Sequence, residues 1–368
     1  MSRLLGTGDG GRGLPVHPVG MVRSPTPLPA GLGHAVFTTR EARGHGVSPD
    51  RLRAGDLVSL GRGLWALRSR EVTEAEIVAA HCRVHPAAFA AGITAAHLWD
   101  FPLPGALGDK VVTAPVRSAR ADGQLVQTSE VGTVDRRIHL ATTAWRPLGT
   151  DLIRWSGSSL SRDQLSALVP LKQVAVDQVV PLTSRIRTLL DLGSVLQPEA
   201  LTVIGDHLVR RPRPRFEGRT QPFATIEQLQ TAAEEHTGRG VRAVRAAMKM
   251  VRMSSDSPAE TRLRLAFLRA GLPEPVANSR LRVAVAPGDG LIDLGEPDLQ
   301  WPQWRVVLEH AGPSHLRPEQ LARDIERTER RRDAGWLEVR TTARDLRHEC
   351  RSAIVRTRAA LASRGWRG

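Results

Sequence analysis

Cysteine is almost absent from this chain of 368 residues, which carries only Cys82 and Cys350. Two thiols so far apart in the sequence form neither a disulfide framework nor a cysteine-based zinc motif. Long hydrophobic runs are also missing, since none approaches the roughly 18 apolar residues that a membrane-spanning helix needs. These absences exclude disulfide-rich secreted proteins and membrane-spanning proteins. We expect a reduced, cytoplasmic protein without a membrane partner.

Lysine is scarce, although positive charge is abundant. The chain has 52 Lys and Arg against 38 Asp and Glu, a formal net charge of +14, and its lysines are Lys110, Lys172 and Lys249. A surplus of this size favours a polyanionic partner, above all nucleic acid. A GC-rich genome, which inflates arginine usage, is an alternative source of part of this charge. The length suggests two or three domains with ample material for a core.

The N-terminal part predicts a tail followed by a small domain. Residues 1–34 are rich in glycine and proline and lack the apolar region of a signal peptide, so we expect disorder. Within residues 35–70, helices are predicted to begin after Thr38 and after Ser48, which is followed by a proline at the first helical position. Alternating apolar residues on both sides of Arg62 predict a hairpin. Helix, turn, helix and hairpin is the order of a winged helix.

This segment resembles the N-terminal DNA-binding domain of AbiEi-type antitoxins from type IV toxin–antitoxin systems. The resemblance implies that the second helix enters the major groove and that the hairpin contacts phosphates or the minor groove. Arg51, Arg53 and Arg62 are then the DNA-binding residues, and double-stranded DNA and a cognate toxin are the partners. The alternatives are a winged helix used for protein contacts, or three surface arginines without a partner.

A middle domain is predicted at residues 71–210, with a mixed α/β pattern. Helical patterns cover 73–84 and 87–99, and short β-type runs follow around 110–116, 125–129 and 138–142. The later stretch Val180–Leu192 is similar to a Pro-Val-Thr-Ser-x-x-Arg-Thr-Leu-x-Asp-Leu segment of the same antitoxin-like proteins. In it, Thr183 or Ser184 caps a helix, and Asp191 is placed to pair with Arg187. No catalytic constellation is apparent in this domain.

A basic segment, residues 211–254, joins the middle domain to the C-terminal part. It begins with a stretch rich in arginine and proline, which either grips phosphates or forms a solvated hinge. Two helices are then predicted between residues 225 and 250. Arg239, Arg242 and Arg245 lie near one face of this pair, where they either hold DNA or face water.

Two carboxylates stand on neighbouring β-type segments of the C-terminal part. Asp298 precedes a Trp-Pro turn, and an apolar strand then delivers Glu309. Upstream, Ser257-Pro258 opens a helix that has Glu260 in its first turn. A pair of carboxylates is what a hard cation such as Mg²⁺ needs, and the cation can activate water against a phosphodiester.

The order of helix, strand, strand, basic helix and strand resembles the PD-(D/E)XK nuclease core, closest to its branch related to very-short-patch-repair endonucleases. The resemblance covers roughly residues 255–362, so 255–368 is expected to be a restriction-endonuclease-like α/β domain. It implies Asp298 and Glu309 as metal ligands, with Glu260 assisting, and His315 as a group that activates water or contacts phosphate. The whole chain is therefore expected to be an α+β multidomain protein that binds DNA.

The likeness has one departure at the second acid. Two residues after Glu309, on the same face of the strand, the superfamily carries Lys and this branch carries Asp, whereas this chain has Ala311. No lysine lies nearby, so His310, His315 or Arg340 would have to replace it. Two functions remain open: a Mg²⁺-dependent DNA endonuclease, and a non-catalytic regulator or antitoxin-like protein with a degenerate nuclease fold.

Each acid also has a purely structural interpretation. Glu260 is favoured by the dipole of the helix that it opens, and Asp298 could cap the Trp-Pro bend. Asp293 is a rival for the first metal acid. For Glu309 the structural interpretation is weaker, because a carboxylate that ends a buried strand needs a partner or a metal. The sequence does not determine the oligomeric state.

Overall fold

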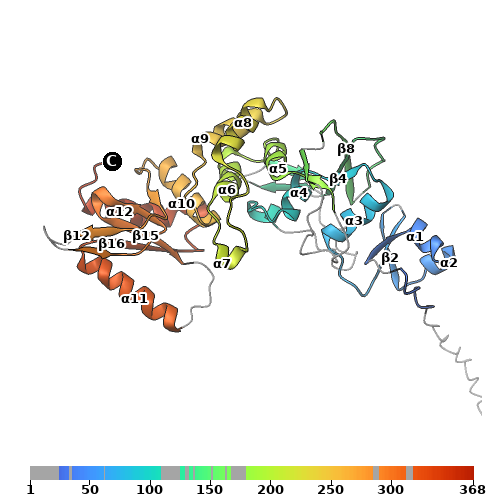
Figure 1. Cartoon of the computed structure of the whole chain (residues 1–368), viewed down its shortest axis with the longest axis horizontal. Coiled ribbons are helices and arrows are strands. Elements are labelled where there is room, and N and C mark those ends of the chain that lie inside the picture. Colours follow the sequence, from blue (N-terminus) through green and yellow to red (C-terminus); the bar gives the residue numbers. More distant parts are fainter. Residues whose placement is uncertain are drawn as a thin grey trace, which may run out of the picture.

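The computed structural model describes residues 25–32, 35–61, 63–108, 125–128, 132–135, 137–150, 152–161, 164–166, 180–284, 290–311 and 318–368. In this part of the chain the protein is a mixed α/β structure with several open sheets. Figure 1 shows the first helices and strands at one end of the molecule and the last ones at the other. Most of the predicted tail 1–34 and all of the predicted run 110–116 lie outside the described residues.

The N-terminal unit is a three-stranded antiparallel sheet with two short helices. Its elements are β1 (Val36–Thr38), α1 (Thr39–Gly44), α2 (Pro49–Leu52), β2 (Leu57–Gly61) and β3 (Leu64–Leu67), with strand order β1-β3-β2. Thr38 caps α1 through a reciprocal bond with Glu41, and Ser48 caps α2, as their residue types predict. A small core of Phe37, Ala42, Val47, Leu52 and Leu57 holds the unit together.

The sheet of this unit is fixed to α3 (Glu74–Val84) of the middle part. Arg83 of α3 donates to Glu41 Oε1 at 2.6 Å and to the Val36 carbonyl oxygen at 2.7 Å. Val36 and Leu64 belong to the same hydrophobic core as the middle part. Because one buried core crosses this boundary, the N-terminal unit is seated on the middle part rather than tethered to it.

The middle part contains a five-stranded sheet of order β8-β7-β4-β10-β9. Its strands and helices are β4 (Ala88–Ala90), α4 (Gly92–Leu98), β7 (Ile138–Thr142), β8 (Ile153–Gly157), β9 (Leu165–Ser166), β10 (Leu182–Thr183) and α5 (Arg185–Leu192). A short 3-10 turn, η1 (Gly105–Gly108), and a separate hairpin of β5 (Leu125–Thr128) with β6 (Gly132–Asp135) complete it. The strand predicted at 138–142 is β7, and Ser184 caps α5.

One helix predicted here is wrong in part. We expected residues 87–99 to be a continuous helix, but Ala88–Ala90 forms β4 and only Gly92–Leu98 is helical. The segment pairs with β7 on one side and β10 on the other, so tertiary hydrogen bonding overrides the helix propensity of its alanines. Gly92, at φ +55°, makes the change from strand to helix possible.

A group of four helices follows: α6 (Pro198–Val209), α7 (Pro214–Glu217), α8 (Ile226–Glu235) and α9 (Val241–Met250). Leu229, Val244 and Met248 of α8 and α9 join the core of the middle part. The turn before α9 lies directly on the turn after α5: a Cβ added to Gly240, at φ +83°, would be 2.0 Å from the carbonyl carbon of Gly193. The predicted basic linker therefore leads into helices that are packed against the middle sheet.

A buried ion pair joins these helices to the C-terminal unit. Arg264 of α10 (Pro258–Arg269) donates to Asp206 Oδ2 of α6 at 2.8 Å, and Thr261 donates to the same oxygen at 2.9 Å. The two charged side chains are only 2% and 1% exposed. Their contacts make α6 and α10 one packed pair.

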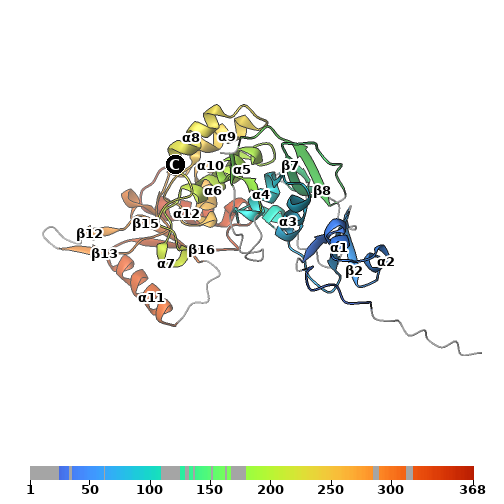
Figure 2. The same ribbon diagram turned by 45° about the vertical axis from the view of Figure 1, so that its right-hand side comes forward.

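The C-terminal unit has a four-stranded sheet of order β11-β14-β15-β16. Its elements are α10, β11 (Val276–Ala277), β12 (Arg282–Ala284), β13 (Leu291–Asp293), β14 (Leu299–Trp301), η3 (Pro302–Trp304), β15 (Val306–Ala311), α11 (Pro318–Asp333), β16 (Leu337–Thr342), η4 (His348–Cys350) and α12 (Arg351–Ser363). Figures 1 and 2 show α11 on one side of the sheet and α12 on the other, with the β12–β13 hairpin projecting outward. The helix–strand–strand–helix–strand order predicted from sequence is present.

Candidate functional site

Asp298 and Glu309 lie opposite one another on neighbouring antiparallel strands. Leu299 pairs with Leu308, so continuing the register by one residue sets Asp298 against Glu309. Directly opposed side chains leave the same face of a sheet. This is the face that α11 covers, because Arg331 of α11 reaches Glu309 on it. The two acids predicted to act together therefore share one face.

Asp298 is a partly buried acid in the electrostatic field of both other predicted acids. Its Oδ2 accepts the His310 backbone N–H at 2.6 Å. Burial raises the pKa of Asp298, and the charges of Glu309 and Glu260 add to the rise, which brings the pKa to about 7. The carboxyl group therefore exchanges its proton near neutral pH. A perturbation of this kind is frequent at functional sites.

Glu309 is bound by a buried arginine from the covering helix. Arg331, 1% exposed, donates to Glu309 Oε1 at 2.6 Å and to Glu338 Oε2 of β16 at 2.9 Å. Its Nε–H donates to the Leu294 carbonyl oxygen at 3.0 Å, which fixes the guanidinium in place. A fixed positive charge therefore already stands against the carboxylate that was predicted to bind a metal.

Both oxygens of Glu260 are occupied by hydrogen bonds. Oε1 accepts the Ser257 hydroxyl at 2.6 Å, while Oε2 accepts the Asp256 N–H at 2.9 Å and the Asn278 side-chain amide at 2.5 Å. The side chain is 5% exposed. Burial raises its pKa, although the bonds from Ser257 and Asn278 oppose the rise. As placed, Glu260 secures the start of α10 and does not offer a free oxygen to a cation.

These carboxylates fit a divalent cation only in part. Mg²⁺ is commonly held by one or two carboxylates together with water and substrate phosphates. Asp298 and Glu309 each keep one oxygen without a hydrogen bond to a described residue. Within the described ranges, no three His, Cys, Asp or Glu side chains come together closely enough to hold a metal ion. The donors fit a weak Mg²⁺ site built on two carboxylates.

The groups proposed to replace the absent lysine lie in different places. Ala311 is exposed at the end of β15. His310 points to the opposite face from Glu309, since side chains alternate, and its Nδ1 lies 3.0 Å from Thr341 Oγ1. Arg340 donates to Glu338 Oε1 at 2.7 Å instead of Glu309. His315 lies outside the described residues.

An open pocket adjoins Asp298 on the side of the basic segment. Arg211 and Arg213, which follow α6, line it together with Asp298, Asn278 and Glu296. Arg213 donates to Asp256 at 2.5 Å, whereas Arg211 is exposed. Cationic side chains thus stand beside the carboxylates, as binding of a phosphodiester next to them would require.

The arginines predicted to contact DNA differ in their surroundings. Arg51 is committed to the fold, because its guanidinium binds both oxygens of Asp56, at 2.8 and 2.7 Å, and donates to the Thr26 carbonyl oxygen at 2.6 Å. Arg53 is free to meet a ligand, since its side chain is 76% exposed and its contact with Asp50 is an exposed one. Arg62 lies outside the described residues.

The rival acid Asp293 lies outside the site, whereas two residues that were not predicted belong to it. Asp293 is exposed on β13 and bound by Arg280, which leaves it outside the group around Asp298. Sequence reasoning missed Arg331 and Glu338. The signal for Arg331 was its helical spacing of four residues from Arg327, which places both on one face of α11.

Neither models of protein families nor curated proteins give a match to the chain. No helix in the described ranges is both long and apolar enough to cross a bilayer. A proposal for the function therefore rests on the geometry and charge of the side chains.

Proposed function

We propose that the protein binds duplex DNA through a winged helix at its N-terminus, and that its C-terminal domain is a degenerate PD-(D/E)XK-like fold that holds DNA without cutting it. The observation that carries this proposal is the bond from Arg331 to Glu309. A guanidinium at 2.6 Å already neutralises the acid that a metal would need, and Ala311 supplies no further ligand or cation.

The N-terminal unit supports the DNA-binding half of the proposal. It has the helix–turn–helix and hairpin order of a winged helix, although α2 is only four residues long. At the end of α2, Arg53 is accessible to DNA, whereas Arg51 is held by Asp56. The net charge of +14 supplies the long-range attraction to phosphates.

The DNA-binding half is tested with a labelled duplex and fluorescence anisotropy. Arg53→Gln combined with Arg62→Gln should weaken binding and make the salt dependence shallower by about one counterion per lost phosphate contact. Arg364→Gln combined with Arg367→Gln, two exposed changes after α12, removes the same charge and is the control, which should weaken binding less. Wild-type affinity and salt slope in the variant of Arg53 and Arg62 would reject DNA recognition by this unit.

A contrasting variant separates folding from recognition. Arg51→Ala removes the bidentate bond to Asp56 and the bond to the Thr26 carbonyl. It should lower the melting temperature because it breaks partly buried charged hydrogen bonds. After correction for the folded fraction, its DNA affinity should equal that of the wild type.

A second function, Mg²⁺-dependent endonuclease activity, is favoured by Asp298 alone. Burial is the main cause of its raised pKa, and the charges of Glu309 and Glu260 add to the rise; a bound cation would offset both. Asp298 and Glu309 would hold Mg²⁺, and the ion would supply the activated water for phosphodiester hydrolysis. Arg331, which already contacts Glu309, would then be placed to offset negative charge beside the metal.

Plasmid cleavage distinguishes the two functions. Purified protein is incubated with supercoiled plasmid and Mg²⁺ or Mn²⁺, with EDTA in a parallel sample. Binding without cutting supports the degenerate fold, and Ala311→Lys should then introduce weak, metal-dependent cutting. Cutting by the wild type that disappears in Asp298→Asn would establish the endonuclease and reject the non-catalytic proposal.

A further inference from the structure

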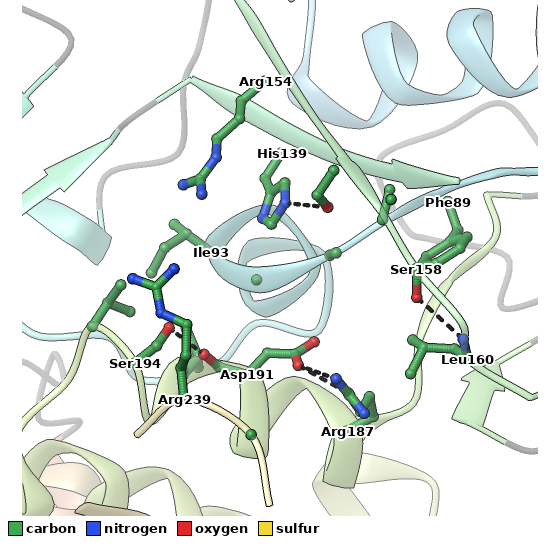
Figure 3. Close-up of a pocket in the computed structure, with 18 of the residues that line it drawn as sticks. Phe89, Ile93, His139, Arg154, Ser158, Leu160, Arg187, Asp191, Ser194 and Arg239 are labelled. Atoms are coloured by element: carbon green, nitrogen blue, oxygen red, sulfur yellow. Dashed lines mark hydrogen bonds and ion pairs between the residues drawn. The ribbon is translucent and has the colours of Figure 1, made fainter. Parts of the chain in front are cut away.

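An amphipathic pocket of about 290 Å³ lies in the middle part, apart from both regions discussed above. Strands β7 and β8 form one side, the start of α4 lies at its base, and α5 and the turn between α8 and α9 form the other side. Figure 3 shows Arg154 and Arg239 at one end of it, and Phe89 and Leu160, with the paired Arg187, at the other. The volume is near the lower limit of ligand pockets, roughly 300 Å³, and so suits a small molecule.

Two arginines in this pocket are not held in an ion pair by any described residue. Arg154 comes from β8 and Arg239 from the α8–α9 turn, and their guanidinium groups point toward one another across the pocket (Figure 3). Neither has a hydrogen bond or ion pair to a described residue. The two acids of the pocket pair with other arginines, since Arg187 binds Asp191 at 2.8 Å and Arg137 binds Asp135 at 2.6 Å, and Asp135 attracts Arg154 without a direct contact.

The histidine next to Arg154 adds no further positive charge to the pocket. His139 is half-buried, and desolvation together with the charge of Arg154 lowers its pKa to about 4, so it is neutral at physiological pH. Its Nε2 lies 2.9 Å from Ser156 Oγ. Gly92 is required beneath this ring, since a Cβ there would be 2.7 Å from His139 Nδ1.

The position of Arg239 is set by the glycines on both sides of it. A Cβ on Gly238 would approach the His236 ring to 2.5 Å, and Gly240 is pressed against the backbone of Gly193. Two exposed guanidinium groups held toward one another repel, and an anion between them removes that cost. The fixed turn therefore holds Arg239 at the pocket without an acid partner among the described residues.

We propose that this pocket binds a small phosphorylated metabolite, with its phosphate between Arg154 and Arg239 and its apolar part against Phe89 and Leu160. A phosphate monoester carries about −1.5 to −2 charge at neutral pH, which matches two guanidinium groups, whereas a carboxylate carries only one charge. The ligand would bridge the strand side and the helix side of the middle part. This site is independent of the proposed DNA and metal chemistry.

Isothermal titration of the full-length protein with AMP tests the proposal, with inorganic phosphate and adenosine as its charged and uncharged halves. At about 0.15 M salt, the wild type should bind AMP with a dissociation constant of about 1 mM or lower, and phosphate more weakly. Adenosine alone should bind weakest of the three, because it leaves the arginines unneutralised.

Two variants and one control locate the binding. Arg154→Gln and Arg239→Gln should each weaken AMP binding about tenfold or more, the effect of losing one charge-assisted hydrogen bond. Arg239→Lys should retain part of the affinity, since it keeps the charge but loses the planar fork. Arg242→Gln, exposed on α9 and outside the pocket, should bind AMP as the wild type does.

Three results would overturn the proposal. The first is no binding of AMP or phosphate at concentrations up to about 10 mM. The second is an equal loss of affinity in Arg239→Gln and Arg242→Gln, which would indicate diffuse electrostatic attraction. The third is a loss of DNA affinity in the two pocket variants without any binding of AMP, which would assign the arginines to DNA. Melting curves without ligand show that each variant is folded.

Discussion

Asp298→Asn replaces the acid with a neutral group of the same shape. The asparagine oxygen can still accept the His310 N–H that Asp298 Oδ2 now accepts at 2.6 Å. The substitution therefore keeps the bond and removes the negative charge that burial and the two neighbouring acids disfavour. We expect it to stabilise the protein at neutral and alkaline pH.

The expected gain follows from the raised pKa. The folded protein binds the Asp298 proton more tightly than the unfolded chain, so the wild-type free energy of unfolding falls as pH rises from about 4 to about 7 and stays level above. The rise from 3.8 to about 7 corresponds to about 4 kcal/mol, at 1.36 kcal/mol for each pKa unit. Asp298→Asn should therefore equal the wild type near pH 4 and exceed it by up to about this amount at pH 8.

Urea unfolding followed by tryptophan fluorescence measures this difference at several pH values. Trp301 and Trp336 are buried in the C-terminal unit and report on its unfolding. Glu296→Gln is the control, because it removes an exposed acid from the same pocket and should not change the pH dependence. A constant difference between Asp298→Asn and wild type across the range would refute the electrostatic explanation.

The same variant also tests whether Mg²⁺ binds to Asp298 and Glu309. If Asp298 and Glu309 hold the ion, Mg²⁺ should stabilise the wild type at pH 8 in proportion to its binding and have little effect on Asp298→Asn. An equal effect on both proteins would place the cation elsewhere.

Three further predictions concern packing and charge. Arg331→Met should cost about 1.5–3 kcal/mol in urea unfolding, because it removes charged hydrogen bonds to Glu309 and Glu338 while Arg340 still pairs with Glu338, and adding Glu338→Gln should recover part of the loss. Gly240→Ala should lower the melting temperature far more than Gly218→Ala: both have positive φ, but only a Cβ at Gly240 meets backbone, at 2.0 Å. Asp206→Ala should cost about 3–5 kcal/mol by leaving buried Arg264 with only a longer contact to Glu274 at 3.8 Å, whereas a change below about 1 kcal/mol would show that the pair is solvated.

Local signals in the sequence predicted much of the fold. Thr38 and Ser48 identify helix starts because capping depends on residues three positions apart. The opposition of Asp298 and Glu309 follows from two short strands joined by a tight Trp-Pro turn. In contrast, the alanines at 88 and 90 form a strand because β7 and β10, distant in sequence, supply its hydrogen bonds.

Side-chain partners at the site could not be read from sequence. Arg331 lies 22 residues from Glu309, and their contact depends on how α11 is rotated over the sheet. The same is true of Arg51, which looked exposed on a short helix but turns back to Asp56. The chain has many arginines, and tertiary geometry decides which of them meets a given acid. Residue spacing alone does not predict that choice.

The contact between α6 and α10 also has a consequence for the proposed binding of DNA. Asp206 and Arg264 join the C-terminal unit to the helices beside the middle sheet, while Arg83 joins the N-terminal unit to the other side of that sheet. Because both junctions are held by these ion pairs, the N-terminal and C-terminal units stay at a constant separation. If the N-terminal and C-terminal units bind one duplex, the two stretches of DNA that they protect should lie a constant number of base pairs apart. This number should not depend on the sequence between them.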